Sequence, residues 1–170
     1  GLNVVQGARL AGAAKIIACD LSTEKMEMAR HFGATDTIDP AGDAVKQIFE
    51  MTGGMGVDYA FEVVGSGKLV EQCLKATRKG GNIVVVGVGR LDDKFSIRQP
   101  IMVFTAKTLM GSMYGGVNFK TDFPMYLDLY RQGKLDLDSL VSKTYTLDDA
   151  MVAFEDLEKG ANARGVIVHP

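Results

Sequence analysis

Residues 1–20 read GLNVVQGARLAGAAKIIACD, and this stretch decides the fold. A glycine opens an amphipathic helical pattern, and a short apolar run over residues 15–20 then ends on Asp20. The N-terminus of a helix presents free N–H groups to a phosphate, and an acid about twenty residues after the glycines reaches a ribose hydroxyl. The stretch therefore predicts the second part of a dinucleotide-binding βαβ unit.

The complete fingerprint of that unit is G-x-G-x-x-G directly after a strand. Gly1 matches its last glycine, so the first strand and the first two glycines are expected to precede residue 1. We therefore expect one dinucleotide-binding domain over residues 1–170, truncated at its N-terminus. The first strand of its sheet is expected to be missing.

Helical and extended patterns alternate after this stretch, with short links between them. The pattern predicts strands at 15–20, 34–39, 57–64, 83–86, 107–113 and 166–168, and helices at 23–32, 43–52, 68–76, 119–132 and 148–159. Ser22 is expected to begin the second helix and Gly33 to end it. Such alternation predicts a Rossmann-like, doubly wound α/β fold, with a mostly parallel sheet and helices on both faces.

Composition excludes several classes of protein. With 170 residues, 46% hydrophobic and 24% charged, the chain can bury one core of ordinary size. The net charge of −2 lacks the basic surplus of a nucleic-acid binder, and no apolar run is long enough for a bilayer. Cys19 and Cys73, expected in the core, are too few for a disulfide scaffold, so we predict a cytoplasmic protein.

Several motifs, in this order, resemble the cofactor domain of zinc-dependent, medium-chain alcohol dehydrogenases. They are residues 1–20, GAT at 33–35, GVDYAFEVVG at 56–65, KGG at 79–81 and GSMYGG at 111–116. The resemblance covers essentially the whole chain and is strongest to the branch with the glutathione-dependent formaldehyde dehydrogenases. It implies an oxidoreductase that transfers hydride between an alcohol or aldehyde and NAD.

In that family a catalytic domain holds the active-site zinc through Cys and His ligands, and none of these ligands can be placed here. The two cysteines lie far apart, and the only histidines are His31, in a predicted helix, and His169, near the end. The resemblance therefore implies the NAD half of an enzyme whose zinc is bound outside this chain. We assign no catalytic and no metal-binding residue, and expect the chain alone to bind cofactor without turnover.

The resemblance also implies a set of cofactor contacts. Gly1 would lie under the pyrophosphate, and Arg164 would reach it from the last loop. Asp20 would accept hydrogen bonds from the adenosine ribose, with Lys25 beside it. The other contacts would be Leu21 and Val64 around the adenine, backbone groups of Val86, Ser112 and Tyr114 on the nicotinamide carboxamide, and Val88 near the nicotinamide ribose. The family often has a basic residue where this chain has Ser66.

Other interpretations of these residues remain open. Asp20 could cap the next helix, and Lys25 and Arg164 could be solvated. Glu62, in an otherwise apolar strand, is expected to be structural and to hydrogen-bond nearby backbone at the sheet end. Because an acid at position 20 would repel a 2′-phosphate, NAD is favoured over NADP.

Three alternative functions remain open. They are a domain of a zinc-free, NADPH-dependent quinone reductase, an S-adenosylmethionine-dependent methyltransferase, and a module that binds NAD without catalysis. The partners we expect are a small alcohol or aldehyde and a second copy of the chain, with neither nucleic acid nor membrane. In the family an edge strand pairs across a two-fold axis; the candidate is Thr105–Met113, in which Lys107 is the only charge.

Overall fold

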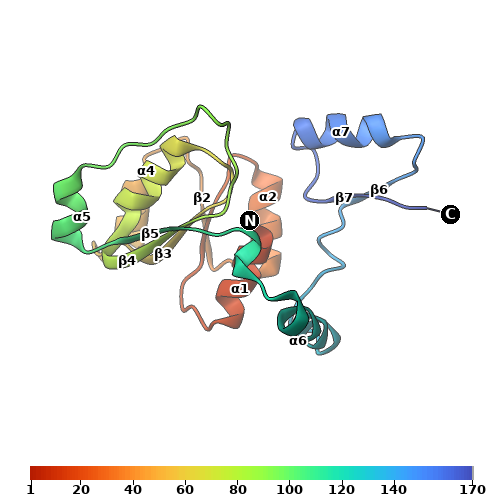
Figure 1. Cartoon of the computed structure of the whole chain (residues 1–170), viewed down its shortest axis with the longest axis horizontal. Helices are drawn as coiled ribbons and strands as arrows, with labels where there is room; N and C mark the ends of the chain where they lie inside the picture. Colours follow the sequence, from red (N-terminus) through yellow and green to blue (C-terminus); the bar gives the residue numbers. More distant parts are fainter. Residues whose placement is uncertain (170) are drawn as a thin grey trace.

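Helices and strands alternate along the computed structural model, which describes residues 1–169 (Figure 1). The first half contains α1 (Leu2–Leu10), β1 (Ile17–Cys19), α2 (Thr23–Phe32), β2 (Asp36–Ile38), α3 (Ala44–Met51), β3 (Val57–Glu62), α4 (Gly67–Ala76) and β4 (Thr77–Val85). The second contains α5 (Gln99–Thr105), β5 (Thr108–Gly111), the 3-10 turn η1 (Tyr114–Gly116), α6 (Phe119–Arg131), β6 (Lys143–Tyr145), α7 (Ala150–Glu158) and β7 (Gly165–Ile167). The predicted elements are present, although most strands are shorter than expected.

Local capping explains why α2 begins and ends where the sequence predicts. The Ser22 hydroxyl accepts a hydrogen bond from the Lys25 N–H at 3.3 Å, which satisfies one free donor of the first turn. Gly33 ends the helix in the left-handed conformation, with φ of 116°. The α2 boundaries predicted from the sequence are therefore confirmed.

All strand pairs are parallel, but they form three sheets rather than one. β1 pairs with β2, β3–β4–β5 form a second sheet, and β6 pairs with β7. The complete doubly wound sheet has six strands in the spatial order 3-2-1-4-5-6. In that sheet β2 corresponds to the third strand and β1 to the second. β3, β4 and β5 correspond to the fourth, fifth and sixth strands. No strand within residues 1–169 corresponds to the first strand, so the doubly wound sheet is divided at that point.

β4 begins earlier than the sequence indicates. The glycine pair after Lys79 predicts a turn before the strand, whereas β4 starts at Thr77, directly after α4. The register moves from Val57↔Thr77 to Tyr59↔Asn82, so four residues of β4 stand opposite one residue of β3. The glycines therefore form a bulge inside the strand, where Gly80 takes a φ of 69°.

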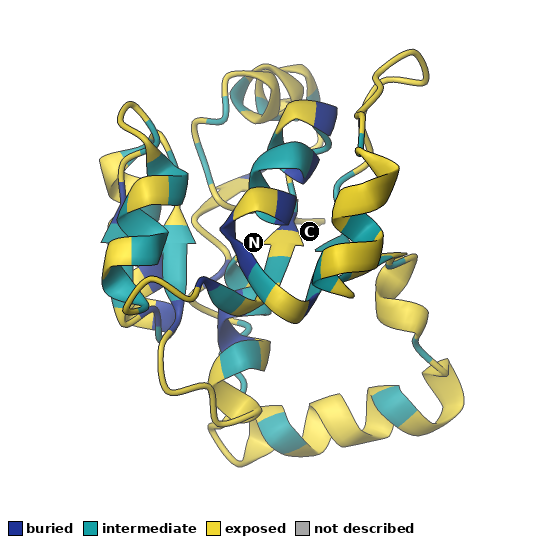
Figure 2. Cartoon of the chain, turned by 90° about the vertical axis from the view of Figure 1, so that its left-hand side faces the viewer, coloured by how far each residue is buried: buried dark blue, intermediate teal, exposed yellow. Residues whose placement is uncertain are grey.

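Two apolar clusters hold the first two sheets to their helices (Figure 2). One joins α1, α2 and the residues beside β1, and it consists of Val5, Ile16, Ala29, Phe32, Ala34 and Leu140. The other packs Val70 and Leu74 of α4 against Ile83 of β4. By contrast, α6 has no buried residue, and most of its residues are exposed.

β6, α7 and β7 form a separate lobe, joined to α6 by a long segment (Figure 1). This segment is fastened to α1. The side chain of Gln6, which is fully buried, donates to the carbonyl of Asp136 and accepts from its N–H, both at 2.8 Å. Leu140 is buried beside Val5 and Phe32. The assignment of residues 1–170 to one domain stays a prediction.

Candidate cofactor-binding site

The predicted cofactor residues follow the carboxyl ends of the strands. β1 ends one residue before Asp20, β3 ends two residues before Val64, and β5 ends one residue before Ser112. Val86 directly follows β4. Because β3, β4 and β5 are parallel neighbours, their ends meet at one edge of the sheet, where ligands of open α/β sheets bind.

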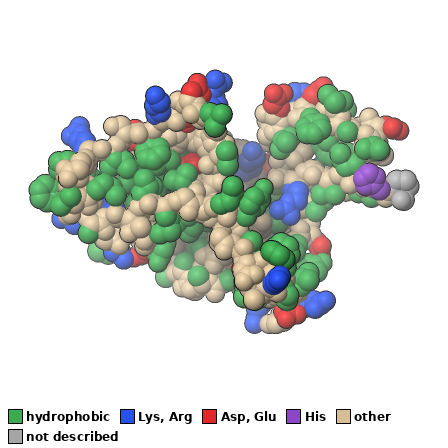
Figure 3. Space-filling model, in the orientation of Figure 1, with side chains coloured by type: hydrophobic (Ala, Val, Ile, Leu, Met, Phe, Trp, Pro, Cys, Tyr) green, Lys and Arg blue, Asp and Glu red, His purple; other side chains and the backbone are tan. Residues whose placement is uncertain are grey.

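Large apolar side chains are exposed at these strand ends. The exposed fractions are 81% for Leu21, 71% for Val64, 91% for Val88 and 87% for Tyr114. Figure 3 shows further hydrophobic side chains over β3–β5 and α5. Exposed apolar side chains next to polar backbone groups are typical of ligand-binding sites.

Glycines bring the loops after β3 and β4 into backbone contact. A Cβ atom at Gly65 would lie 2.5 Å from the Val88 carbonyl carbon, and one at Gly87 would lie 2.1 Å from the Gly65 nitrogen. The Glu62 carbonyl accepts from the N–H groups of Val86 and Gly87, at 2.8 and 3.0 Å. The two loops therefore form one tightly packed floor, in which side chains at these glycines have no room.

Several backbone groups at this edge have no hydrogen-bond partner among residues 1–169, and three of them lie at residues that the resemblance assigns to the carboxamide. These three are the carbonyl oxygens of Val86 and Ser112 and the N–H of Tyr114. Tyr114 also holds a φ of 47°, a left-handed conformation that is strained for a residue other than glycine. Two acceptors and one donor complement a primary carboxamide, which offers two N–H donors and one carbonyl acceptor.

The Glu62 carboxylate fixes the turn after β3. Its Oε1 accepts from the N–H groups of Val64 at 2.9 Å, Gly65 at 2.8 Å and Ser66 at 3.3 Å. The predicted structural role of Glu62 at the sheet end is therefore confirmed. Its second oxygen, Oε2, is buried and has no partner within the described chain.

Asp20 and Gly1 lie close together. The Asp20 carboxylate is near enough to the Gly1 nitrogen to act on it electrostatically. Gly1 also approaches β3, since a Cβ there would lie 3.6 Å from Val63 Cγ2. The Oδ1 atom of Asp20 accepts from the N–H of Ser22, the residue before α2, at 2.9 Å, whereas Oδ2 has no partner in residues 1–169.

Lys25 lies beside the loop that leads to Arg164. A small cleft of about 50 Å³ separates the start of α2, including Ser22 and Lys25, from residues 160–163. The Ser142 hydroxyl accepts from the Arg164 N–H at 3.2 Å, and the Ser142 N–H donates to the Arg164 carbonyl at 3.0 Å. The backbone of Arg164 is thus held in place, and the residue is exposed.

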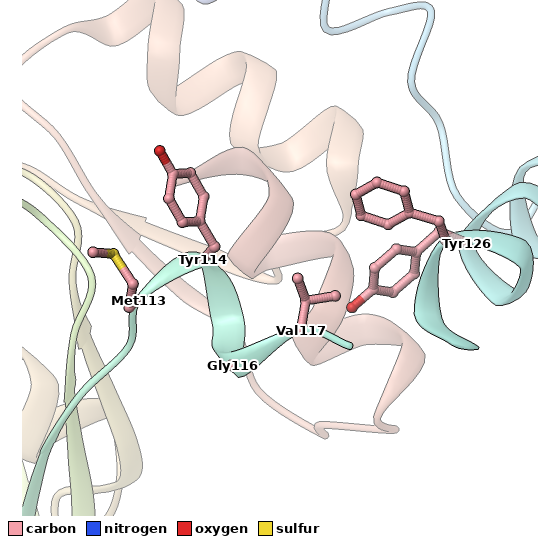
Figure 4. Close-up of a pocket in the computed structure, with 6 residues that line it drawn as sticks. Met113, Tyr114, Gly116, Val117 and Tyr126 are labelled. Carbon is pink, nitrogen blue, oxygen red and sulfur yellow. The ribbon is translucent and has the colours of Figure 1, made fainter. Parts of the chain in front are cut away.

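An apolar hollow of about 450 Å³ next to Tyr114 was not expected from the sequence. Met113, Tyr114, Gly116 and Val117 form one wall, and Phe123 and Tyr126 of α6 form the other. In Figure 4 the Tyr126 ring lies near Val117, across from η1. The aromatic residues of α6 were the available signal, because several of them remain exposed on an amphipathic helix.

The core placement of Cys19 is wrong. Cys19 is exposed at the end of β1, a three-residue strand with a neighbour on one side only, and Cys73 is half-buried on α4. Burial, followed by the charge of Glu62, raises the pKa of Cys73 to about 11. The described residues contain no group of three His, Cys, Asp or Glu side chains that could hold a metal ion, and no helix able to span a membrane.

Fold and site together define a Rossmann-type nucleotide-binding unit. The chain belongs to the zinc-binding dehydrogenase family, whose model matches residues 1–132. It is 35% identical over 177 residues to S-(hydroxymethyl)glutathione dehydrogenase of Paracoccus denitrificans, across 99% of this chain and 47% of that protein.

Solved structures agree with this assignment. Benzyl alcohol dehydrogenase of Acinetobacter calcoaceticus superposes with a TM-score of 0.93 at 32% identity, over 99% of this chain and 47% of that one. A zinc-binding dehydrogenase of Sinorhizobium meliloti, bound to NADP, superposes with a TM-score of 0.81 at 32% identity, over 89% of this chain and 44% of that one. The chain spans about half the length of the curated relatives it matches.

Proposed function

We propose that this chain is the NAD(H)-binding part of a zinc-type alcohol dehydrogenase. The observation that carries the proposal is the set of unpaired backbone groups at Val86, Ser112 and Tyr114, which lies beside the exposed apolar side chains of the strand ends. When bound, the nicotinamide ring would accept a hydride as NAD or donate one as NADH. The residues of this chain bind and orient the cofactor and perform no proton transfer.

Each predicted residue has a role that its surroundings support. The N-terminus of α1 at Gly1 offers free N–H groups to the pyrophosphate, and Arg164 adds a guanidinium. The free Oδ2 of Asp20 accepts from the adenosine ribose, and Lys25 lies on the same side. Leu21 and Val64 pack on the adenine and Val88 near the nicotinamide ribose, while Val86, Ser112 and Tyr114 bind the carboxamide.

The whole enzyme would oxidise a small alcohol or reduce the corresponding aldehyde. The side chains of residues 1–169 do not fit a zinc ion, so we place the metal on protein outside this chain and derive no step through it. The unpaired carboxamide-binding groups favour a nicotinamide cofactor over S-adenosylmethionine, which carries no carboxamide. The chain alone is expected to bind NAD without turnover, in a cytoplasmic setting that leaves both thiols unpaired.

A comparison of NADH with NADPH tests the cofactor assignment. The chain should bind NADH saturably and NADPH at least tenfold more weakly, because the Asp20 carboxylate repels a 2′-phosphate (~1.4 kcal/mol per factor of ten). Asp20→Asn should weaken the binding of NADH and reduce the preference for NADH over NADPH. The dissociation constants are measured by the fluorescence of the reduced nicotinamide.

The matched control is Asp43→Asn, which removes a helix-capping carboxylate on α3 and should leave both constants unchanged. A preference of the unaltered chain for NADPH would contradict the role of Asp20 and favour the quinone-reductase alternative. Absence of binding to either cofactor would contradict the proposed function itself.

We propose a homodimer through the edge of β5. β5 pairs with β4 on one side only, and its exposed residues Thr108 and Met110 leave the other edge open to a second copy. Next to this edge, α5 exposes Val103 and Phe104, the latter to 80%. An open edge strand beside exposed apolar residues is suited to two-fold pairing.

Charges on that edge should separate the subunits. Thr108→Asp together with Met110→Asp would place like charges opposite each other across the two-fold axis, and sedimentation velocity should change from dimer to monomer. Met151→Asp, at an exposed position on α7, serves as the control and should stay dimeric. A double variant that remains dimeric would show that β5 is not the interface.

A further inference from the structure

The carboxylate of Glu62 lies directly beneath the loops that we assign to the nicotinamide end of the cofactor. Its side chain is 98% buried, since the residue is 2% exposed. The unpaired Oε2 faces Gly87, where an added Cβ would lie 2.8 Å from that oxygen. Gly87 stands between Val86 and Val88, the residues assigned to the carboxamide and to the nicotinamide ribose.

The surroundings of the Glu62 carboxylate donate hydrogen bonds to it and, within residues 1–169, supply no counter-charge. An ionised carboxylate only accepts, and all three hydrogen bonds to Oε1 come from N–H donors. No cationic side chain of the described residues forms an ion pair with Glu62. The ion pairs within these residues use other carboxylates, such as those of Asp36, Asp58 and Asp156. Burial keeps water away from the charge, so its field extends further than that of a surface acid.

A buried negative charge at this place distinguishes the two redox states of the cofactor. The nicotinamide ring carries a positive charge in NAD and none in NADH. We propose that Glu62 sets the relative affinity of the site for the two forms, by stabilising the charged ring of NAD from beneath the Val86–Val88 loop. The inference rests on the proposed function and adds an electrostatic role to the structural one.

The expected size of the effect follows from Coulomb's law. At an effective dielectric constant of about 20, two unit charges about 10 Å apart change a binding equilibrium roughly tenfold. Glu62→Gln should therefore weaken the binding of NAD roughly tenfold and change the dissociation constant of NADH by less than about twofold. A merely structural role would weaken both forms alike, because both use the same loops.

Isothermal titration calorimetry of the full chain with NAD and with NADH measures both constants. The control is Asp58→Asn, which removes a carboxylate at the opposite end of the same strand, where it is 69% exposed and pairs with Arg78. This variant should leave the ratio of the two constants unchanged. An equal loss for NAD and NADH in Glu62→Gln, or no change in either, would overturn the inference.

A second variant decides the question if Glu62→Gln does not fold. Ser66→Lys adds a positive charge beside the same carboxylate, and Ser66 makes no side-chain capping bond that would be lost. Ser66→Lys should weaken NAD relative to NADH by at least about twofold. This effect is smaller than that of Glu62→Gln, because solvent screens the added charge. An unchanged ratio would overturn the inference, and failure of the unaltered chain to bind either form would overturn the proposed function with it.

Discussion

Gly87→Ala should destabilise the chain by about 3 kcal/mol or more and abolish NADH binding. The new Cβ would lie 2.1 Å from the Gly65 nitrogen, 2.7 Å from the Val64 carbonyl carbon and 2.8 Å from Glu62 Oε2. Two of these atoms are backbone, so the strain cannot be relieved by rotating a side chain. The loops after β3 and β4 would have to separate, and the floor of the cofactor site would be lost.

Urea unfolding followed by circular dichroism measures the change in free energy, and NADH fluorescence measures binding. Gly111→Ala is the matched control, because nothing lies within 4 Å of a Cβ at that residue, which ends β5. It should change the free energy of unfolding by less than about 0.5 kcal/mol. An unfolding midpoint for Gly87→Ala equal to that of Gly111→Ala would show that the two loops are not in contact.

Gln6→Leu should cost about 2–4 kcal/mol of stability, since it leaves the N–H and the carbonyl of half-buried Asp136 without partners. The Gln6 amide satisfies both the N–H and the carbonyl of Asp136, each at 2.8 Å, from a position with no solvent exposure. Leucine has a similar volume but offers neither donor nor acceptor. The segment that links α6 to β6 should therefore detach from α1.

Limited proteolysis checks this detachment, because a loosened segment would be cleaved between residues 132 and 142. Urea unfolding supplies the free energy. Gln47→Leu makes the same chemical change at a side chain with one long hydrogen bond of 3.4 Å, to the Asp39 carbonyl, and should have little effect. If Gln6→Leu is as stable and as protease-resistant as Gln47→Leu, the Gln6 bridge contributes nothing.

Local chemistry made much of the fold predictable. Ser22 and Gly33 define the ends of α2 through contacts within a few residues, and a sequence shows such contacts directly. The carboxyl ends of the strands were predicted to within two residues, because runs of apolar residues stop there. Asp20, Val64 and Val86 were therefore expected next to these ends. The alternation of elements predicted parallel strands, and every strand pair is parallel.

Features that depend on distant parts of the chain could not be predicted. Gln6 and Asp136 are 130 residues apart, and nothing near Gln6 indicates its partner. The unpaired Oε2 of Glu62 lies against Gly87, in the loop after β4, and no residue near Glu62 in the sequence indicates this neighbour. The exposure of Cys19 likewise depends on how β1 is paired, which periodicity does not reveal.

The burial of Leu140 fixes one end of the segment that leads to β6. Leu140 is 3% exposed and packs with the core of α1 and α2, so the chain up to that residue moves with the helix that begins at Gly1. The next residues, Val141 and Ser142, lead into β6 and the lobe that carries Arg164. The position of Arg164 relative to the N-terminus of α1, and with it the pyrophosphate contact that we propose, therefore depends on the conformation of these two residues.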